Sequence, residues 1–277
     1  LRGYDTRGHV TAQGAMDTGL TAGTPVIGGM FDVDACAYGC GTFSPTSICS
    51  IAGTWNINVQ VAGEMDYAGG IRQCIRRTDG TTALKIDSSA TSAVNITWYV
   101  EKLLGCDRTG FDRFDSCLSG YGYAVDSPYF IPFVNGALDT GLDKAVFSGI
   151  DVSCGPEDLF AAVYEGVCFA HRRHLEHLDR ENKTVSLTLT GGAARGNEFC
   201  RLFADITGKQ VKTVNIEQSG AFGVWAAAAY ATGLYESMEQ AVENRLAAIG
   251  VFNPDNARNQ LFNFRYEKFK ELIKCHL

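Results

Sequence analysis

Apolar residues in the first half of the chain fall in short runs that are separated by clusters of Gly and Asp. β-Branched residues in such runs are typical of strands bounded by turns. They predict strands at Pro25–Gly28, Thr54–Val61 and Ala83–Asp87. Residues 91–104 favour a helix, whereas residues 106–139 are rich in Gly, Asp, Tyr and Phe and are expected to form long loops.

Helical spacing becomes clear after residue 149. Leu159, Val163 and Val167 recur on one helix face, and Pro156 stands where a first helical turn accepts proline, so we expect a helix to about Leu178. The rest of the chain alternates, with strands predicted at 184–190 and 211–216 and helices at 197–207, 220–233, 238–249 and 255–274. This alternation is typical of an α/β layer with parallel strands.

The charge balance excludes one class of partner. With a formal net charge of -7 and a pI of about 5.3, the chain offers no basic face for displacing counterions from a phosphate backbone, so nucleic acid is not expected. The longest apolar stretch, Gly220–Tyr235, is too short to span a membrane. No signal-peptide pattern opens the sequence, and we expect a cytoplasmic protein without a membrane partner.

The spacing of the cysteines and histidines along the sequence is not typical of a metal site. The ten cysteines form no CxxC pair, which favours reduced, mostly buried thiols over a disulfide framework or a zinc site. Among His171, His174 and His177, only neighbouring pairs share a helix face, and Arg172 and Arg173 between them indicate a solvated helix end. We therefore expect no metal bound by the protein itself.

The strongest local feature is "LTLTGGAARGNEF", in which a predicted strand turns at Gly191-Gly192 into a helix. Glycines let backbone approach a ligand closely, and a helix N-terminus attracts anions, so this corner suits a nucleotide. Two glycines that merely permit a tight turn are an equal alternative. The stretch is neither a P-loop nor a GxGxxG fingerprint, which argues against an oxidoreductase of the Rossmann type.

Gly53 and Thr54 stand at the head of a predicted strand in "IAGTWNINV". Backbone N–H groups at the glycine and the threonine hydroxyl could contact a phosphate. An ordinary hairpin start explains the same residues and is the preferred interpretation of this stretch when it is taken alone.

Asp32 follows a predicted strand and precedes a run of small residues in "TPVIGGMFDVDACAYGCG". Such a position favours a helix cap. It also suits an acceptor of a hydroxyl proton, because the positive end of a helix favours negative charge. Asp34 is expected to be structural or to face solvent.

Taken together, these motifs resemble the FGGY family of carbohydrate kinases. The resemblance is carried in the family's order by residues 10–41 with their TGL and GTPV runs, by "GIDVSCGPEDLFAAVYEGVCF" at 149–169, and by "LTGGAARGNEFCRLFADITGKQV" followed by "EQSGAFGVWAAAAYATGLY". "GGMFD" and "GTWNINV" look most like the L-xylulokinase branch. The family's DxGT phosphate loop has no counterpart.

The resemblance implies an α/β fold of the ribonuclease-H-like type found in actin, hexokinase and Hsp70. The chain would be about half of a full member. Residues 1–41 would be the tail of the N-terminal sugar-binding domain and residues 42–277 the C-terminal nucleotide-binding domain.

The same resemblance assigns roles and ligands. Asp32 would be the general base, Gly53 and Thr54 would contact the ATP phosphates, and Gly191, Gly192 and Asn197 would carry the adenosine. Mg²⁺ is expected as the partner of ATP. The partner would be a small sugar, a pentulose such as L-xylulose, with D-xylulose or glycerol as alternatives; a homodimer stays open. A non-catalytic nucleotide-binding regulatory module is the rival function, and the isolated 277 residues are expected to be inactive as a kinase.

Overall fold

The computed structural model describes residues 2–67, 71, 73–107, 115–136, 141 and 144–276. Its centre is a seven-stranded mixed sheet with the strand order β11-β10-β9-β3-β4-β6-β5. The strands are β3 (Ser47–Ala52), β4 (Asn56–Ala62), β5 (Gln73–Arg76), β6 (Ala83–Ser89), β9 (Ser186–Thr190), β10 (Gln210–Val214) and β11 (Ala248–Phe252). β9 is parallel to both β3 and β10, and the other neighbouring pairs are antiparallel.

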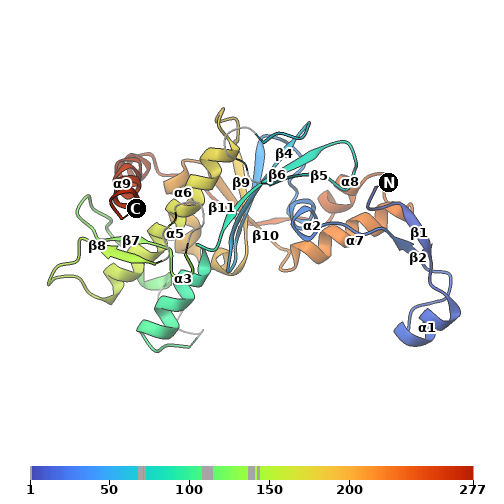
Figure 1. Cartoon of the computed structure of the whole chain (residues 1–277), viewed down its shortest axis with the longest axis horizontal. Helices are drawn as coiled ribbons and strands as arrows, with labels where there is room; N and C mark the ends of the chain where they lie inside the picture. Colours follow the sequence, from blue (N-terminus) through green and yellow to red (C-terminus); the bar gives the residue numbers. More distant parts are fainter. Residues whose placement is uncertain are drawn as a thin grey trace.

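One face of this sheet is covered by the long helix α5 (Pro156–Leu178), with α6 (Asn197–Thr207) and α9 (Asn256–Cys275) packed beside it (Figure 1). The main hydrophobic core lies between these helices and sheet residues such as Ile48 and Leu187. α5 begins as the sequence predicted, because Pro156 fits a first helical turn and the Asp158 carboxylate accepts from the Gly155 N–H at 2.8 Å.

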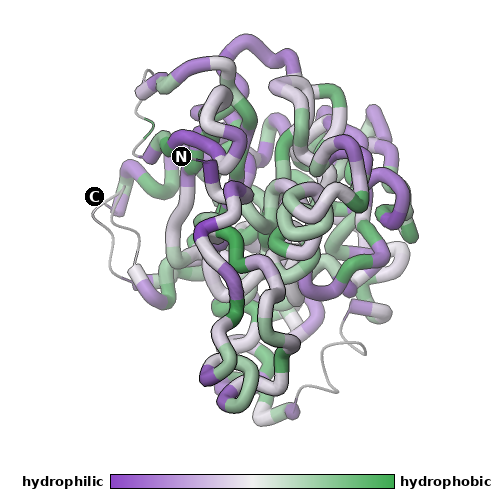
Figure 2. The backbone as a smooth tube through the Cα atoms, turned by 90° about the vertical axis from the view of Figure 1, so that its right-hand side faces the viewer, coloured by the Kyte–Doolittle hydropathy of each residue, from purple (hydrophilic) through white to green (hydrophobic). Residues whose placement is uncertain are grey.

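The opposite face is covered by α2 (Asp32–Gly39), which packs against α7 (Ser219–Ala231), and α7 in turn packs against α8 (Met238–Glu243). Ala37 of α2 shares a core with Val59 and Leu84 of the sheet. Hydrophilic stretches follow much of the outer surface, whereas hydrophobic segments gather in the interior (Figure 2). No helix within the described ranges is long and apolar enough to cross a membrane.

An arm projects from the body at the N-terminal end of the chain (Figure 1). It consists of β1 (Thr6–His9), α1 (Ala12–Thr18) and β2 (Pro25–Ile27), with β1 and β2 paired antiparallel. A second small sheet pairs β7 (Tyr129–Ile131) with β8 (Val146–Ser148) beside α5.

Several elements differ from the sequence prediction. The helix expected at 238–249 ends at Glu243, and β11 follows it as an edge strand that pairs with β10. The helix expected at 91–104 is α3 (Ala93–Trp98) continued by a π-helical turn, Tyr99–Leu103. β3 was missed, and the strand predicted from Thr54 begins at Asn56. Pairing across the sheet, which local propensity does not contain, decides the limits of β3, β4 and β11.

Candidate functional site

The carboxyl ends of three neighbouring parallel strands meet at one edge of the sheet. β3 ends at Ala52, β9 at Thr190 and β10 at Val214. In open α/β sheets, ligands bind in the crevice outside such strand ends. The loops that follow these strands therefore form the candidate site.

Two of these loops are in backbone contact. Gly191 has φ +97° and ψ 178°, a conformation essentially confined to glycine. A Cβ on Gly191 would lie 2.6 Å from the carbonyl carbon of Ala52 and 2.8 Å from the nitrogen of Gly53. The structure thus brings together the two predicted turns, Gly53-Thr54 and Gly191-Gly192. The hairpin reading of Gly53 is confirmed, because β3 and β4 pair up to Ala52 and leave residues 53–55 as the turn.

A cleft of about 530 Å³ opens beside this contact, a volume within the usual range for small-molecule sites. Its lining contains Gly191, Gly192 and Asn197, which the resemblance to the family assigned to adenosine. The other described lining residues are Leu189, Thr190, Ala194, Arg195, Thr213, Val214, Ile216, Glu217, Gln218, Ile249 and Gly250. Gly192 has open space around it, so its backbone can be approached closely.

The N-terminus of α6 is not the open anion site that the sequence suggested. The Asp115 carboxylate accepts from the backbone N–H groups of Glu198 and Phe199, each at 3.2 Å. Gly196 makes room for it, because a Cβ there would lie 2.4 Å from Asp115 Oδ1. The helix end is thus neutralised from within the protein. Sequence reasoning missed Asp115 because it lies in the segment read as irregular loop.

Asp32 is the first residue of α2 rather than its cap. Phe31 occupies the N-cap position without a side-chain hydrogen bond, and Asp32 Oδ1 instead accepts from the backbone N–H of Val33 at 2.7 Å. The residue is exposed to solvent. Its carboxylate therefore stands at the positive end of a helix with access to a ligand.

Asp34, two residues further on, is structural, and the solvent-facing alternative is wrong. It is 1% exposed and pairs with Arg77 at 2.8 Å. The backbone N–H and the hydroxyl of Thr78 both donate to its other oxygen at 2.8 Å. The Arg77 guanidinium in turn lies 3.9 Å above the ring of Tyr38. This buried set anchors α2 and thereby fixes the position of Asp32.

A tight crossing of α2 and α7 connects Asp32 with the cleft. A Cβ on Gly39 would lie 2.0 Å from the Ser219 carbonyl oxygen, and one on Gly223 would lie 2.0 Å from that of Ala35. A Cβ on Gly220 would lie 4.0 Å from the Asp32 carbonyl oxygen. The first turn of α7 therefore lies between the backbone of Asp32 and the loop that lines the cleft.

Two of the three histidines of α5 do not lie on a solvated surface, so that prediction was wrong for His171 and His174. His171 and His174 are buried against the sheet, and only His177 is partly exposed. His171 Nε2 lies 3.0 Å from Ser92 Oγ, and its Nδ1 lies 3.1 Å from Asn58 Oδ1. Burial lowers the pKa of His171 well below its usual value, which keeps the ring neutral.

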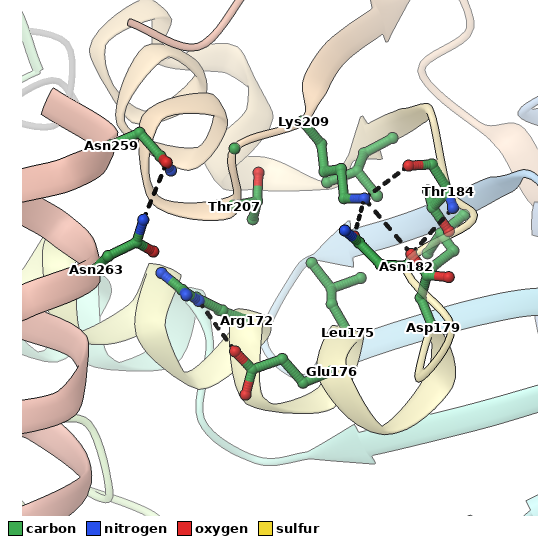
Figure 3. Close-up of a pocket in the computed structure, with 13 residues that line it drawn as sticks. Arg172, Leu175, Glu176, Asp179, Asn182, Thr184, Thr207, Lys209, Asn259 and Asn263 are labelled. Carbon is green, nitrogen blue, oxygen red and sulfur yellow. Dashed lines mark hydrogen bonds and ion pairs between the residues drawn. The ribbon is translucent and has the colours of Figure 1, made fainter. Parts of the chain in front are cut away.

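A second cavity, of about 320 Å³, lies between α5, α9 and the start of β10 (Figure 3). Its charged groups are engaged with one another. Arg172 pairs with Glu176 at 3.2 Å, and Lys209 Nζ lies 3.6 Å from Asp179 Oδ2. The charged groups of this pocket are therefore paired within the protein.

The fold is shared with solved sugar kinases. Xylulose kinase from Rhodospirillum rubrum matches with a TM-score of 0.87 at 20% identity, over 99% of this chain and 56% of that one. Plasmodium falciparum glycerol kinase, solved with ADP, matches with a TM-score of 0.83 at 15% identity, over 98% of this chain and 55% of that one. These matches confirm the predicted α/β class, the actin-like ATPase fold of the C-terminal half of such kinases.

The family model for the C-terminal domain of the FGGY family of carbohydrate kinases matches residues 67–232. The chain therefore belongs to the FGGY family of carbohydrate kinases, as the motifs indicated. It is 29% identical over 269 residues to the L-xylulose/3-keto-L-gulonate kinase of Escherichia coli (strain K12). The matched residues cover 96% of this chain and 53% of that protein. A probable L-xylulose kinase of Pasteurella multocida (strain Pm70) is 28% identical over 96% of this chain and 53% of that protein. The chain spans about half the length of these curated relatives.

Proposed function

We propose that this chain is the nucleotide-binding part of an ATP-dependent kinase that phosphorylates a small sugar, a pentulose such as L-xylulose. The observation that carries the proposal is the backbone contact between the Gly53 and Gly191 turns beside an open cleft. The choice of sugar is supported by the relatives from Escherichia coli and Pasteurella multocida, which are an L-xylulose/3-keto-L-gulonate kinase and a probable L-xylulose kinase.

In this proposal the adenosine occupies the cleft against Gly191, Gly192 and Asn197. The phosphates then extend toward the β3–β4 turn, where the backbone of Gly53 and the exposed hydroxyl of Thr54 donate to them. The N-terminus of α6 takes no phosphate, because Asp115 already accepts its N–H groups. Close backbone approach at the glycines replaces the helix dipole as the main binding device.

Asp32 is the proposed general base. The attacking sugar hydroxyl gives its proton to the Asp32 carboxylate as its oxygen bonds to the γ-phosphorus, and ADP leaves with the electrons of the broken phosphorus–oxygen bond. Such transfer depends mostly on positioning and on neutralisation of charge. The buried pair of Asp34 and Arg77 supplies the positioning, since it anchors the first turn of α2.

Mg²⁺ is proposed as the partner of ATP, where it would neutralise phosphate charge. Glu217 is the only carboxylate among the described residues that line the cleft, which fits an ion held mainly by the nucleotide. We further propose the division expected from the sequence, with residues 1–41 the tail of the sugar-binding domain and residues 42–277 the nucleotide-binding domain. The ten free thiols support a cytoplasmic location.

The test is ADP release by the full-length protein with a panel of pentuloses and glycerol. We expect Asp32→Asn to lower kcat by about 10²–10⁴-fold, the usual contribution of a general base, while nucleotide affinity stays unchanged. Asp17→Asn, an exposed acid on α1, is the matched control and should retain full activity. Equal turnover by the wild type and Asp32→Asn would refute the base assignment.

The rival function is a regulatory module that binds a nucleotide without turning it over. It would be favoured by nucleotide binding without ADP release for any sugar tested. Because the sugar would be held largely by the other half, we also predict little turnover by the isolated 277 residues. Robust turnover by this chain alone would contradict that division of labour.

A further inference from the structure

A second constellation of chemically active side chains lies on the α5 face of the sheet, outside the lining of the cleft. Asp87 of β6 faces His174 and His177, which are three residues apart on α5 and share a helix face. One ligand atom from each side chain lies within 4.8 Å of the other two. Asp87 and His174 are 6% and 3% exposed, whereas His177 is 46% exposed.

Both imidazoles aim the same nitrogen at one carboxylate oxygen. His177 Nδ1 lies 2.8 Å from Asp87 Oδ2, and His174 Nδ1 lies 3.1 Å from the same atom. Despite this distance, His174 Nδ1 makes no hydrogen bond with any part of the chain that the structure describes. A buried ring nitrogen without a hydrogen bond is costly, and a cation placed between the ring and the carboxylate would remove that cost.

The contacts on the other side of the His174 ring are compatible with a lone pair on Nδ1. Its Nε2 lies 2.7 Å from Ser89 Oγ, which lies 2.7 Å from Thr91 Oγ1. If the serine hydroxyl donates to the threonine, His174 donates its Nε2–H to the serine and keeps a lone pair on Nδ1. That lone pair then faces a carboxylate oxygen in a buried site, where two acceptors repel each other unless a cation lies between them.

The donor set selects the kind of cation. Two imidazole nitrogens and one carboxylate oxygen suit Zn²⁺, Co²⁺ or Ni²⁺, whereas Mg²⁺ and Ca²⁺ prefer sites built from oxygen alone. The Ser89 hydroxyl on the far nitrogen of His174 is a typical outer-shell partner that fixes the orientation of a ligating ring. The partly exposed His177 gives an entry path and leaves room for a water molecule as a further ligand.

We propose that Asp87, His174 and His177 form a binding site for a divalent transition metal of the zinc class. The metal joins the C-terminal part of α5 to β6 and displaces the proton from His177 Nδ1 when it binds. Spacing along the chain does not reveal this site, because its carboxylate lies 87 residues before the first of its histidines and is brought there by the sheet.

The test is a titration of the metal-free 277-residue chain with Co²⁺, followed by its visible absorption, with Zn²⁺ as competitor. We expect one equivalent to bind with the spectrum of nitrogen and oxygen ligands. His177→Ala should weaken binding by at least ~100-fold, since even outer-shell partners contribute about 10–100-fold. His276→Ala, an exposed histidine at the end of α9, is the matched control and should bind like the wild type.

Two further variants keep the test decisive. Asp87→Asn should weaken binding as strongly as His177→Ala, and Ser89→Ala should weaken binding by about 10-fold as an outer-shell change. Circular dichroism checks that each variant is folded, and His177→Ala, which changes a partly exposed side chain, is the variant expected to fold normally. Absence of Co²⁺ binding to the wild type, or a thiolate-to-cobalt absorption band that persists in His177→Ala, would overturn the proposal.

Discussion

At the carboxyl edge of the sheet, Gly192 has open space around it, whereas a Cβ on Gly166 of α5 would lie 2.2 Å from the Phe130 carbonyl oxygen. The charged side chains of the two regions differ in exposure in the same way. Asp32 stands exposed at the end of α2, while Glu165 and Arg265 are completely buried as a pair between α5 and α9. The same residue types are therefore open to solvent in one region and packed in the other.

The buried pair of Glu165 and Arg265 makes many hydrogen bonds. Arg265 donates to both oxygens of Glu165 and to the carbonyl oxygens of Ala124, Val125, Ser127 and Pro128. Glu165 and Gly166 belong to the second stretch that resembles the family. Their surroundings show that this stretch holds α5, α9 and the loop before β7 together, whereas the stretches around Asp32 and Gly191 form the open edge.

Removing the buried guanidinium should have the largest effect on stability. Arg265→Ala leaves the Glu165 carboxylate and several carbonyls without a donor, and we expect a loss of about 3–5 kcal/mol in the free energy of unfolding. Urea unfolding measures it. Lys268→Ala on the same helix removes an exposed pair and should change the value by less than about 0.5 kcal/mol. A similar small loss for both variants would contradict the contrast between the regions.

A side chain at the contact between the Gly53 and Gly191 turns should lower both the stability of the protein and its affinity for a nucleotide. Gly191→Ala forces a strained backbone conformation and a clash with Ala52, so we expect a loss of at least ~2 kcal/mol. Nucleotide affinity, measured by titration calorimetry on the remaining folded protein, should fall as well. Gly233→Ala also has a positive φ but meets open space, and it should leave affinity unchanged. Unchanged ADP binding in Gly191→Ala would place the nucleotide elsewhere.

The two neighbouring acids of α2 should separate stability from chemistry. Asp34→Asn weakens the buried contacts with Arg77 and Thr78, and we expect a loss of about 1–2 kcal/mol. Asp32→Asn should cost less than about 0.5 kcal/mol because the side chain is exposed. Thermal unfolding of both variants under one set of conditions compares them. If Asp32→Asn were the more destabilising, its carboxylate would have to be structural.

The smallest effect is expected at the rim of the cleft. Asn197 is exposed at the first position of α6. Asn197→Ala should weaken ADP binding by about 5–10-fold, which corresponds to one hydrogen bond of about 1 kcal/mol. Calorimetric titration measures it, and Asn263→Ala in the second cavity is the control. A larger loss in the control variant would favour the second cavity as the nucleotide site.

Much of the fold could be predicted because local signals agreed with it. Pro156 and the apolar spacing of α5, and the β-branched run before Gly191, were sufficient to place these elements. β11 could not be predicted, because an edge strand with exposed residues gains its stability from pairing with β10. The helix-favouring residues at 244–249 do not indicate that this segment will pair with β10.

The candidate site was predictable at its glycines and less so at its charges. The contact between Gly53 and Gly191 is consistent with the turns singled out along the chain, although their proximity required the sheet. The Asp115 carboxylate accepts a hydrogen bond from the Glu198 N–H at the start of α6, although the two residues are 83 positions apart in the sequence. The convergence of Asp87 with the α5 histidines likewise depends on tertiary structure, which the spacing of residues in the sequence cannot show.

The central claim, that a nucleotide binds at the glycine-lined edge, is tested most directly by photolabelling with an azido-adenine analogue of ATP. We predict that the label is incorporated into residues 189–197 and 213–218, which line the cleft, and that excess ADP competes it away. Label on the residues around Arg172 and Lys209 in the second cavity, or label that ADP does not displace, would contradict the claim.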